Sequence, residues 1–238
     1  QSDFFEEIAK FRAVRRVYAK IMRERFGAAN PESMRLRFHC QTAAASLTKA
    51  QPKINIVRTG LQALAAVLGG AQSLHTNGMD EAFAIPTEEA MKIALRTQQI
   101  IADETGVASV ADPLGGSYFV ESLTTQFEEG IFGVLDEVGR RGGTVKLIEE
   151  GWFQQRIADF AYETATRKAS GEKPVIGVNR HVEPDERFDV EIHPYDPTTA
   201  ERQIARLQRV RRERDHARVA ALLDRLAAVA ADENQNLM

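Results

Sequence analysis

The sequence is poor in cysteine and has no long apolar run. Its 238 residues include a single cysteine, Cys40, which excludes an internal disulfide framework and a cysteine-built metal cluster. No stretch approaches the ~18 consecutive apolar residues that a membrane span needs. Residues 1–6 lack the basic and apolar regions of a signal peptide. These absences predict a cytoplasmic location and no membrane partner.

The sequence also lacks a large excess of charge of either sign. Its formal net charge is −3, so no overall field attracts nucleic acid, and we expect no nucleic-acid partner. Arginine is nevertheless concentrated between residues 202 and 225. This segment is interpreted as a helix with one solvated face and a partner on the other.

The first half of the chain alternates between predicted helices and strands. We expect helices at 3–26, 54–68 and 88–105, and strands at 34–40, 71–75 and 107–111. Short connections between such elements favour parallel strands covered by helices. The loops after the strands carry most of the polar side chains, and chemistry sits at this end in barrels and open α/β sheets.

The second half is predicted to be mainly helical. Helices are expected at 127–138, 145–150 and 152–168, followed by a short strand at 173–179, a linker around 184–197 and one final helix from Thr198 onward. The aromatic residues Trp152, Phe153, Phe160 and Tyr162 are interpreted as core.

The number of strands is too small for a closed structure. About three strands are predicted, whereas a closed barrel of parallel strands needs eight. An open set exposes backbone edges and an apolar inner face. The chain is therefore expected to depend on further sequence, or on another chain, to complete its sheet.

Several ordered motifs resemble the methylmalonyl-CoA mutase family. They are RFHCQT at 37–42, NIVRT at 55–59, QALAAVLGG at 62–70, QSLHTN at 72–77, DEA at 80–82, DPLGGSY at 112–118, the glycine pair at 142–143 and IGVN at 176–179. The opening DFFEEIAK at 3–10 is more similar to the isobutyryl-CoA and 2-hydroxyisobutyryl-CoA branch.

The resemblance implies a fold and a domain order. The fold class is α/β, with residues 1–123 as the carboxyl-terminal half of a (β/α)8 TIM-type barrel, 124–180 as a helical extension, and 181–238 as a linker with an arginine-rich helix. It also implies a radical 1,2-rearrangement of the carbon skeleton of an acyl-CoA, of the methylmalonyl/succinyl or the isobutyryl/2-hydroxyisobutyryl type. The cofactor is adenosylcobalamin.

The resemblance implies that other parts complete the enzyme. The family's cobalt-ligating Asp-x-His-x-x-Gly motif is absent around His181, His193 and His216, so no residue here is expected to bind the metal. A cobalamin-binding domain or small subunit would bring that ligand, and the amino-terminal barrel half would complete the acyl-CoA site. A dimer or heterotetramer is expected.

His39 and Gln41 are the candidate catalytic residues. They are two positions apart on a predicted strand, so they share a face, and both donate hydrogen bonds without carrying charge. By resemblance they face the space between corrin and substrate. Spacing alone favours the other interpretation, a satisfied and partly buried polar pair.

The next strand end holds the other candidate ligands. The resemblance assigns Gln41, Asn77, Glu81 and His75 to the cofactor, with Asn77 and Glu81 near its ribose. It assigns Gln72 and Ser73 to the corrin or CoA side. For Glu81, the alternative is that it merely caps a turn with Asp80.

Basic residues and the cysteine have competing interpretations. Arg35 and Arg37 match positions near the CoA phosphates, which an arginine fork binds well, but they are equally plain surface. Arg58 is interpreted as a structural ion pair or cap. Cys40 has no base partner in the pattern and is not expected to be catalytic.

Two alternatives to a working mutase stay open. The chain is either an inactive half-barrel fragment, or a non-catalytic module whose arginine-rich helix recruits a partner.

Overall fold

The computed structural model describes residues 3–184, 190–232 and 234–235. These residues form two compact units, of which the first ends at His193 and the second begins at Pro194. The boundary lies inside the predicted linker at 184–197. The two units are described separately below, and the predicted division at 123/124 within the first unit stays a prediction.

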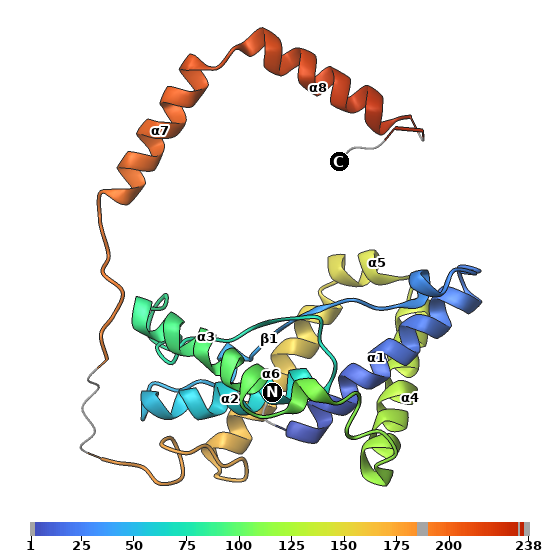
Figure 1. Cartoon of the computed structure of the whole chain (residues 1–238), viewed down its shortest axis with the longest axis vertical. Helices are drawn as coiled ribbons and strands as arrows, with labels where there is room; N and C mark the ends of the chain where they lie inside the picture. The colour runs from blue at the N-terminus through green and yellow to red at the C-terminus, as the bar shows by residue number, and fades with distance from the viewer. Residues whose placement is uncertain (1–2, 185–189, 233, 236–238) are drawn as a thin grey trace. The chain divides into compact units, whose positions relative to one another are not determined.

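The first unit is mainly helical, with a small parallel sheet (Figure 1). Its helices are α1 (Phe4–Glu24), α2 (Asn55–Leu68), α3 (Glu88–Asp103), α4 (Tyr118–Arg140), α5 (Thr144–Glu149) and α6 (Trp152–Ala169). Its strands are β1 (His39–Gln41) and β2 (Ser73–His75). Short 3-10 turns lie at Pro31–Met34, Ala44–Ser46, Pro52–Ile54 and Val107–Ser109. The predicted α/β class is therefore found.

Helices α1 and α3 begin at capping residues. The Asp3 side chain accepts a hydrogen bond from the backbone N–H of Glu6, and the Thr87 hydroxyl accepts one from that of Ala90. Acidic side chains occupy the first turn of both helices, where they stabilise the positive end of the helix dipole. Both predicted helices are confirmed to within two residues at their ends.

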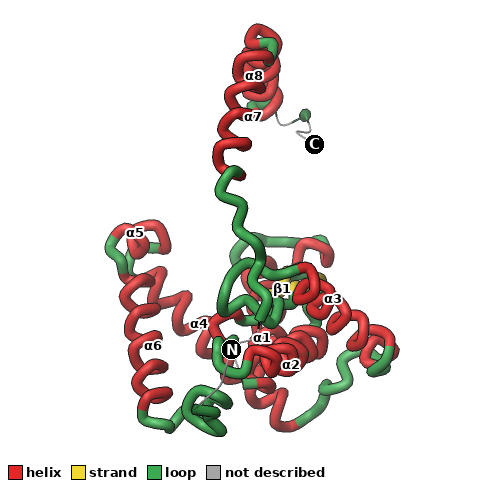
Figure 2. The backbone as a smooth tube through the Cα atoms, turned by 90° about the vertical axis from the view of Figure 1, so that its left-hand side faces the viewer, coloured by secondary structure: helices red, strands yellow, loops and turns green. Residues whose placement is uncertain are grey.

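The two strands are parallel and joined through α2, and they form the short strand region of Figure 2. The register pairs His39 with Ser73, Cys40 with Leu74, and Gln41 with His75. The predicted strand at 34–40 is shorter than expected, because only its end lies beside β2. Residues 31–34 instead form a 3-10 turn that begins at a proline.

Two predicted strands are wrong. The segment 107–111 contains a 3-10 turn, Val107–Ser109, in which the N–H of Ser109 donates to the carbonyl of Gly106. The segment 173–179 is a turn whose only ladder contact among the described residues is an isolated bridge between Ile176 and Arg180. β-Branched residues favour extended backbone, but a strand also needs a neighbouring strand to bond to.

The core of the first unit lies between α1, α2 and α4. Ile8, Ala65 and Val120 form its centre, with Phe4, Leu68 and Leu114 packed around them. Many buried positions are alanines, which allow helices to approach closely. Figure 1 shows α1 and α4 side by side. This contact fixes α1 against α4.

The predicted aromatic core on α6 is not found in the described part of the chain. Phe160 is 53% exposed and Tyr162 is 76% exposed, and α6 has no buried residue. Trp152 packs edge-on against Phe153 and lies beside the Arg141 guanidinium, which follows α4. The periodicity that predicted a helix was right, whereas the inference of burial was wrong.

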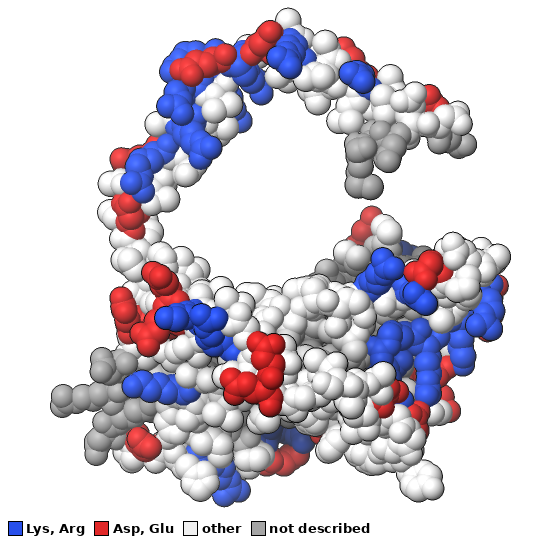
Figure 3. Space-filling view, in the orientation of Figure 1, with Lys and Arg blue, Asp and Glu red and all other residues white. Residues whose placement is uncertain are grey.

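The second unit contains α7 (Thr199–Glu213) and α8 (His216–Ala230). One continuous helix was expected here, and that expectation is wrong. Arg214 is extended, and the Asp215 side chain caps a new helix by accepting from the N–H of Arg218. Lys and Arg side chains gather over α7 in Figure 3. Among the helices that the structure describes, none is long and apolar enough to cross a membrane.

Candidate functional site

The parallel register brings the predicted catalytic strand beside the QSLHTN strand. His39 faces Ser73 across the pair, and its Nδ1 lies 2.8 Å from the Ser73 Oγ. Gln41 is paired with His75, and the N–H of Thr42 donates to the His75 carbonyl at 3.1 Å. Residues 34 positions apart in sequence therefore lie side by side along the two short strands, with His39 and Ser73 at their start and Gln41 and His75 at their end.

Gln41 lies at the mouth of a small cavity. A space of about 190 Å³ between α1, β1 and α2 is lined by Gln41, Thr42, Phe4, Phe11 and Leu61, among others. Gln41 is exposed, and within the described residues its amide makes no hydrogen bond. The side chain is therefore free to bind a ligand.

Asn77 is held beneath the strand ends by Thr42. The Thr42 hydroxyl donates to the Asn77 Oδ1 at 2.6 Å and accepts from the Asn77 backbone N–H at 3.0 Å. Asn77 is 2% exposed, and its Nδ2 has no hydrogen-bond partner in the described chain. A buried amide donor without an acceptor is costly, so this atom gains the most from any acceptor that reaches it.

Glu81 and Asp80 follow in the loop after β2 and behave differently. Asp80 is 2% exposed, and its Oδ2 accepts from the N–H of Thr87, so it fixes the start of α3. Glu81 is half-buried, and its carboxylate makes no hydrogen bond or ion pair with a described residue. The capping alternative therefore applies to Asp80, whereas Glu81 keeps its carboxylate open.

Gln72 joins the two strands. Its Oε1 accepts from the N–H of Phe38 at 2.8 Å, and its Nε2 donates to the Gly70 carbonyl at 2.8 Å. Both ends of the amide are therefore used within the chain. The Ser73 hydroxyl is likewise engaged with His39. These contacts align β1 with β2, and the predicted contact of Gln72 and Ser73 with CoA stays a prediction.

Arg35 and Arg37 lie before β1, at the opposite end from Gln41. They share one partner, because both approach the Glu32 carboxylate, at 2.6 Å and 3.2 Å. Their side chains are 67% and 74% exposed. Exposed ion pairs of this kind are weak, so both guanidinium groups remain available to an anion.

The Cys40 thiol lies beside the site and is not activated. Burial raises the pKa of this thiol above its ordinary value. A protonated thiol is a poor nucleophile. That Cys40 is not catalytic stays a prediction.

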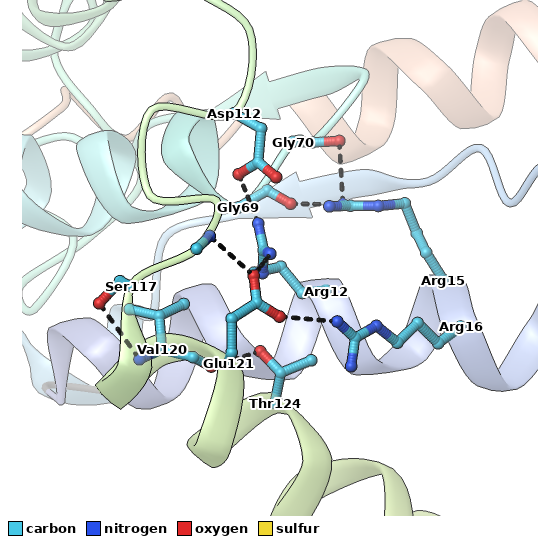
Figure 4. A network of polar contacts seen from close by, with 11 residues as sticks. Arg12, Arg15, Arg16, Gly69, Gly70, Asp112, Ser117, Val120, Glu121 and Thr124 are labelled. Atoms are coloured by element: carbon cyan, nitrogen blue, oxygen red, sulfur yellow. Dashed lines mark hydrogen bonds and ion pairs between the residues drawn. The ribbon is translucent and has the colours of Figure 1, made fainter.

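A network of ionic contacts on α1 was missed at the sequence level. Arg12 points from α1 toward Asp112 and Glu121, and Arg16 also donates to Glu121, at 2.7 Å (Figure 4). Arg12 is 9% exposed. The only signal was the run of arginines at 12, 15 and 16, and their partners lie about a hundred residues further on. No short-range pattern could have paired them.

Arg15 links the same helix to the start of β2. Its Nη1 donates to the carbonyl of Gly69 and lies 3.5 Å from that of Gly70 (Figure 4). Gly70 has φ +80°, and a Cβ there would lie 2.9 Å from the Arg15 Nη1. Glycine is therefore needed at this turn. Since β2 begins three residues later, α1 helps to position the strand.

The carboxylates of this network have depressed pKa values. The hydrogen bond from Arg12 lowers the pKa of Asp112. The N–H of Gly116, with Arg16 and Arg12, lowers the pKa of Glu121. Both carboxylates are therefore ionised at neutral pH, where Glu121 joins α4 to α1 and Asp112 joins the loop before α4 to α1.

Comparisons with known proteins match the entire chain. The sequence model described as methylmalonyl-CoA mutase covers residues 1–238. The 2-hydroxyisobutanoyl-CoA mutase large subunit of Aquincola tertiaricarbonis is 75% identical over 238 residues, which are 100% of this chain and 42% of that protein. The mitochondrial methylmalonyl-CoA mutase of Homo sapiens is 40% identical over 237 residues, which are 99% of this chain and 32% of that protein.

The bacterial relatives agree. The methylmalonyl-CoA mutase of Cereibacter sphaeroides is 42% identical over 240 residues, or 99% of this chain and 33% of that protein. The chain thus spans less than half the length of these relatives. Because the family model and the relatives match from end to end, the chain belongs to the methylmalonyl-CoA mutase family.

Proposed function

We propose that the chain is part of an adenosylcobalamin-dependent acyl-CoA mutase, an isomerase that rearranges the carbon skeleton of its substrate. The observation that carries the proposal is the parallel pairing of β1 with β2 in the register His39–Ser73 and Gln41–His75, in a chain that belongs to this family. Uncharged polar side chains from two family motifs lie side by side there.

The proposal includes a (β/α)8 barrel to which this chain contributes only a part. Among the described residues, β1 and β2 pair only with each other, so each has a free edge. Free strand edges bind further strands readily. The remaining strands would come from the rest of the protein, and the exposed apolar residues Val57 and Leu61 on α2 are suited to packing in such an assembly.

The residues at the strand end fit the proposed cofactor. Within the part of the chain that the structure describes, the Gln41 amide and the Glu81 carboxylate have no partner, and the buried Nδ2 of Asn77 lacks an acceptor. A carboxylate with two amides suits the adjacent hydroxyls of a ribose, with His75 beside them. When bound, adenosylcobalamin supplies the radical chemistry, and its cobalt ligand would come from another domain or subunit. The protein supplies binding and orientation.

His39 and Gln41 would orient the reacting group. The His39 ring is held by the Ser73 hydroxyl, so its Nε2 is directed away from that bond. Neither side chain introduces a formal charge when the imidazole is neutral. Such groups donate hydrogen bonds to a thioester carbonyl without adding an acid that would interfere with radical chemistry. Arg35 and Arg37 would bind the CoA phosphates at the opposite end of β1.

The substrate proposed is a branched acyl-CoA of the 2-hydroxyisobutyryl type. The relative with 75% identity carries that activity in its name, whereas relatives named for methylmalonyl-CoA are 40–42% identical. The same relative is called a large subunit, so we also propose a small cobalamin-binding partner and a hetero-oligomer. The single cysteine supports a cytoplasmic enzyme.

Reconstitution tests the proposal. The protein that carries this chain is mixed with a cobalamin-binding subunit, adenosylcobalamin and either 2-hydroxyisobutyryl-CoA or methylmalonyl-CoA, and product is followed by chromatography. Rearrangement of the first substrate is expected. Gln41→Ala should abolish most turnover, and Gln154→Ala, a matched change on the exposed face of α6, should not. Absence of rearrangement with both substrates would overturn the proposal.

A second candidate is a non-catalytic interaction module. It is favoured by α7 and α8, where Ile204, Leu207 and Leu222 are each about half exposed beside the arginines of α7. Deleting residues 198–238 from the reconstituted protein would separate the two functions. Loss of subunit association with unchanged cofactor binding would support this module.

A further inference from the structure

A basic groove lies on the surface formed by the loop after β1, the first turns of α2, the end of α6 and the turn at 173–178. It shares Ala43, Leu61 and Gln62 with the cavity that Gln41 lines. It has a volume of about 420 Å³. Arg58, Lys168 and Lys173 line it, and no carboxylate does. Since binding pockets for small molecules typically have volumes of roughly 300–1,000 Å³, the groove has the size of a ligand site.

The two lysines are held on a fixed backbone. Asn179 donates from its Nδ2 to the carbonyl of Lys168 at 2.7 Å and to that of Lys173 at 2.9 Å. Its Oδ1 accepts from the N–H of Val175 at 2.7 Å. One side chain thus joins the end of α6 to the following turn. Both lysines are half-buried, and neither ammonium group has a hydrogen bond or ion pair with a described residue.

Arg58 carries a charge that its surroundings do not neutralise. Its guanidinium donates to the Thr48 hydroxyl, to the Asn55 side chain and to the Ile176 carbonyl, at 2.8, 2.7 and 2.8 Å. All these acceptors are neutral, so of the two predicted structural roles, an ion pair or a cap, the ion pair is not found within the described residues. Burial lowers the pKa of Arg58. A cation in the first turn of a helix also faces the positive end of its dipole.

An anion in the groove would offset the free-energy cost of burying the Arg58 charge and of placing it at the positive end of the α2 dipole. Lys168 and Lys173 offer charge-assisted hydrogen bonds, which are the strong ones, and the half-buried Thr164 hydroxyl adds a donor on the same wall. The rest of the wall is apolar, with Phe160 and Val175 among its residues. A bare inorganic ion would leave that wall uncovered.

We propose that this groove binds a phosphorylated small molecule with an aromatic or apolar body, of the nucleoside diphosphate class. The phosphates lie against Lys168, Lys173 and Arg58, and the body packs against Phe160 and its apolar neighbours. The site goes beyond the proposed rearrangement, because none of the strand-end candidates (His39, Gln41, Ser73, His75, Asn77 and Glu81) lines it.

Calorimetric titration of the whole protein tests the site. ADP, AMP, adenosine and pyrophosphate are titrated separately at low and high salt. Affinity should fall from ADP to AMP to adenosine, and it should weaken as salt rises. Pyrophosphate should bind more weakly than ADP, because it lacks a body for the apolar wall. Equal binding of ADP and adenosine, or no binding of ADP, would overturn the proposal.

Variants locate the binding. Lys168→Ala with Lys173→Ala should weaken ADP binding by about a hundredfold, at roughly tenfold per lost charge-assisted bond. Lys168→Arg with Lys173→Arg should keep most of it. Lys92→Ala on α3 removes an exposed lysine outside the groove and should change nothing. Wild-type affinity in the double alanine variant would overturn the proposal, and circular dichroism confirms that the variants fold.

Competition with CoA distinguishes two sources of the same chemistry, since CoA also contains an adenosine diphosphate group. If CoA displaces ADP, and if the double alanine variant also loses CoA binding, the groove binds the nucleotide end of a CoA. If ADP binds undisturbed by CoA, the ligand is a free nucleotide. Both results support a phosphate-binding site in the groove. Because binding is measured without turnover, failure here is separate from failure of the mutase assay.

Discussion

The junction of α1 with α4 and the end of strands β1 and β2 differ in how their polar groups are satisfied. At the junction, each of Arg12, Arg16 and Glu121 has an ionic partner within the chain. At the strand end, the exposed Gln41 amide makes no hydrogen bond with a described residue, and the buried Asn77 Nδ2 has no partner among them. The charged groups at the junction form ion pairs within the chain, although the buried Arg12 Nε has no hydrogen-bond partner in the described residues, whereas the polar groups at the strand end are open to a ligand. The predictions below test that difference.

The largest effect is expected at the junction. Arg12→Ala leaves two carboxylates facing each other without their shared cation. Breaking a buried ion pair costs roughly 3–5 kcal/mol, and because Asp112 is 53% exposed we expect the lower end, about 3 kcal/mol, in the free energy of unfolding. Urea denaturation measures it. Arg16→Ala, at a 42% exposed side chain, should cost under about 1 kcal/mol. Equal losses of unfolding free energy in Arg12→Ala and Arg16→Ala would contradict the role given to the buried Arg12 at the junction.

The next effect is expected beneath the strand end. Thr42→Val removes the hydroxyl that donates to the Asn77 Oδ1 and accepts from its N–H. Leaving buried polar groups unsatisfied costs about 1–3 kcal/mol, which thermal unfolding would detect. Thr125→Val on the exposed side of α4, whose hydroxyl bonds only to the Glu121 carbonyl, serves as the control and should cost much less. If Thr42→Val unfolds at the same temperature as the wild type, Asn77 is positioned by other contacts.

A smaller effect on stability, with a clear effect on activity, is expected at Glu81. Glu81→Ala removes a half-buried carboxylate that has no internal partner, so the free energy of unfolding should change by less than about 0.5 kcal/mol. Use of adenosylcobalamin by the reconstituted enzyme should fall about tenfold or more, as expected when a charged ligand contact is lost. Glu88→Ala, at the exposed start of α3, is the control. Parallel losses of stability and activity would refute the ligand role.

The smallest effect is expected from acid. The pKa of Asp112 is lower in the folded chain than in the unfolded chain, chiefly because Arg12 donates a hydrogen bond to it. Its stabilisation is therefore complete above the ordinary aspartate pKa of about 3.9 and is lost as pH falls through the lower folded value. In Asp112→Asn, the free energy of unfolding should decrease less steeply below about pH 4 than in the wild type. Denaturant unfolding at a series of pH values measures this. Asp103→Asn should leave the slope unchanged.

Local rules predicted most helices better than the sheet, although the helix expected at 127–138 begins at Tyr118 and the one expected from Thr198 is two helices. Asp3, Thr87 and the glycine pair after α2 mark helix ends through short-range hydrogen bonds and backbone preferences, which act whatever the rest of the fold does. The segment 107–111 has the composition of a strand, yet it forms a 3-10 turn because no neighbouring strand bonds to it. Extended backbone depends on partners that local sequence does not contain.

The candidate site was predicted only in part for the same reason. Spacing predicts that His39 and Gln41 share a face. It does not predict the hydrogen bond between His39 and Ser73, or the one from Thr42 to Asn77. Spacing also does not predict that both ends of the Gln72 amide bond to the backbone of this chain, and its expected contact with a ligand stays a prediction. The pairing of side chains across two strands follows from register, which depends on how helices pack.

By itself, the sequence determined the family, the helices and the two strand-end motifs, because caps, periodicity and motif order act along the chain. Only the tertiary structure decided that Arg12 joins α1 to Asp112 and Glu121, that Arg15 positions the turn before β2, and that Lys168, Lys173 and Arg58 share one groove. Those contacts join residues that are far apart in sequence, and they exist only once the helices pack.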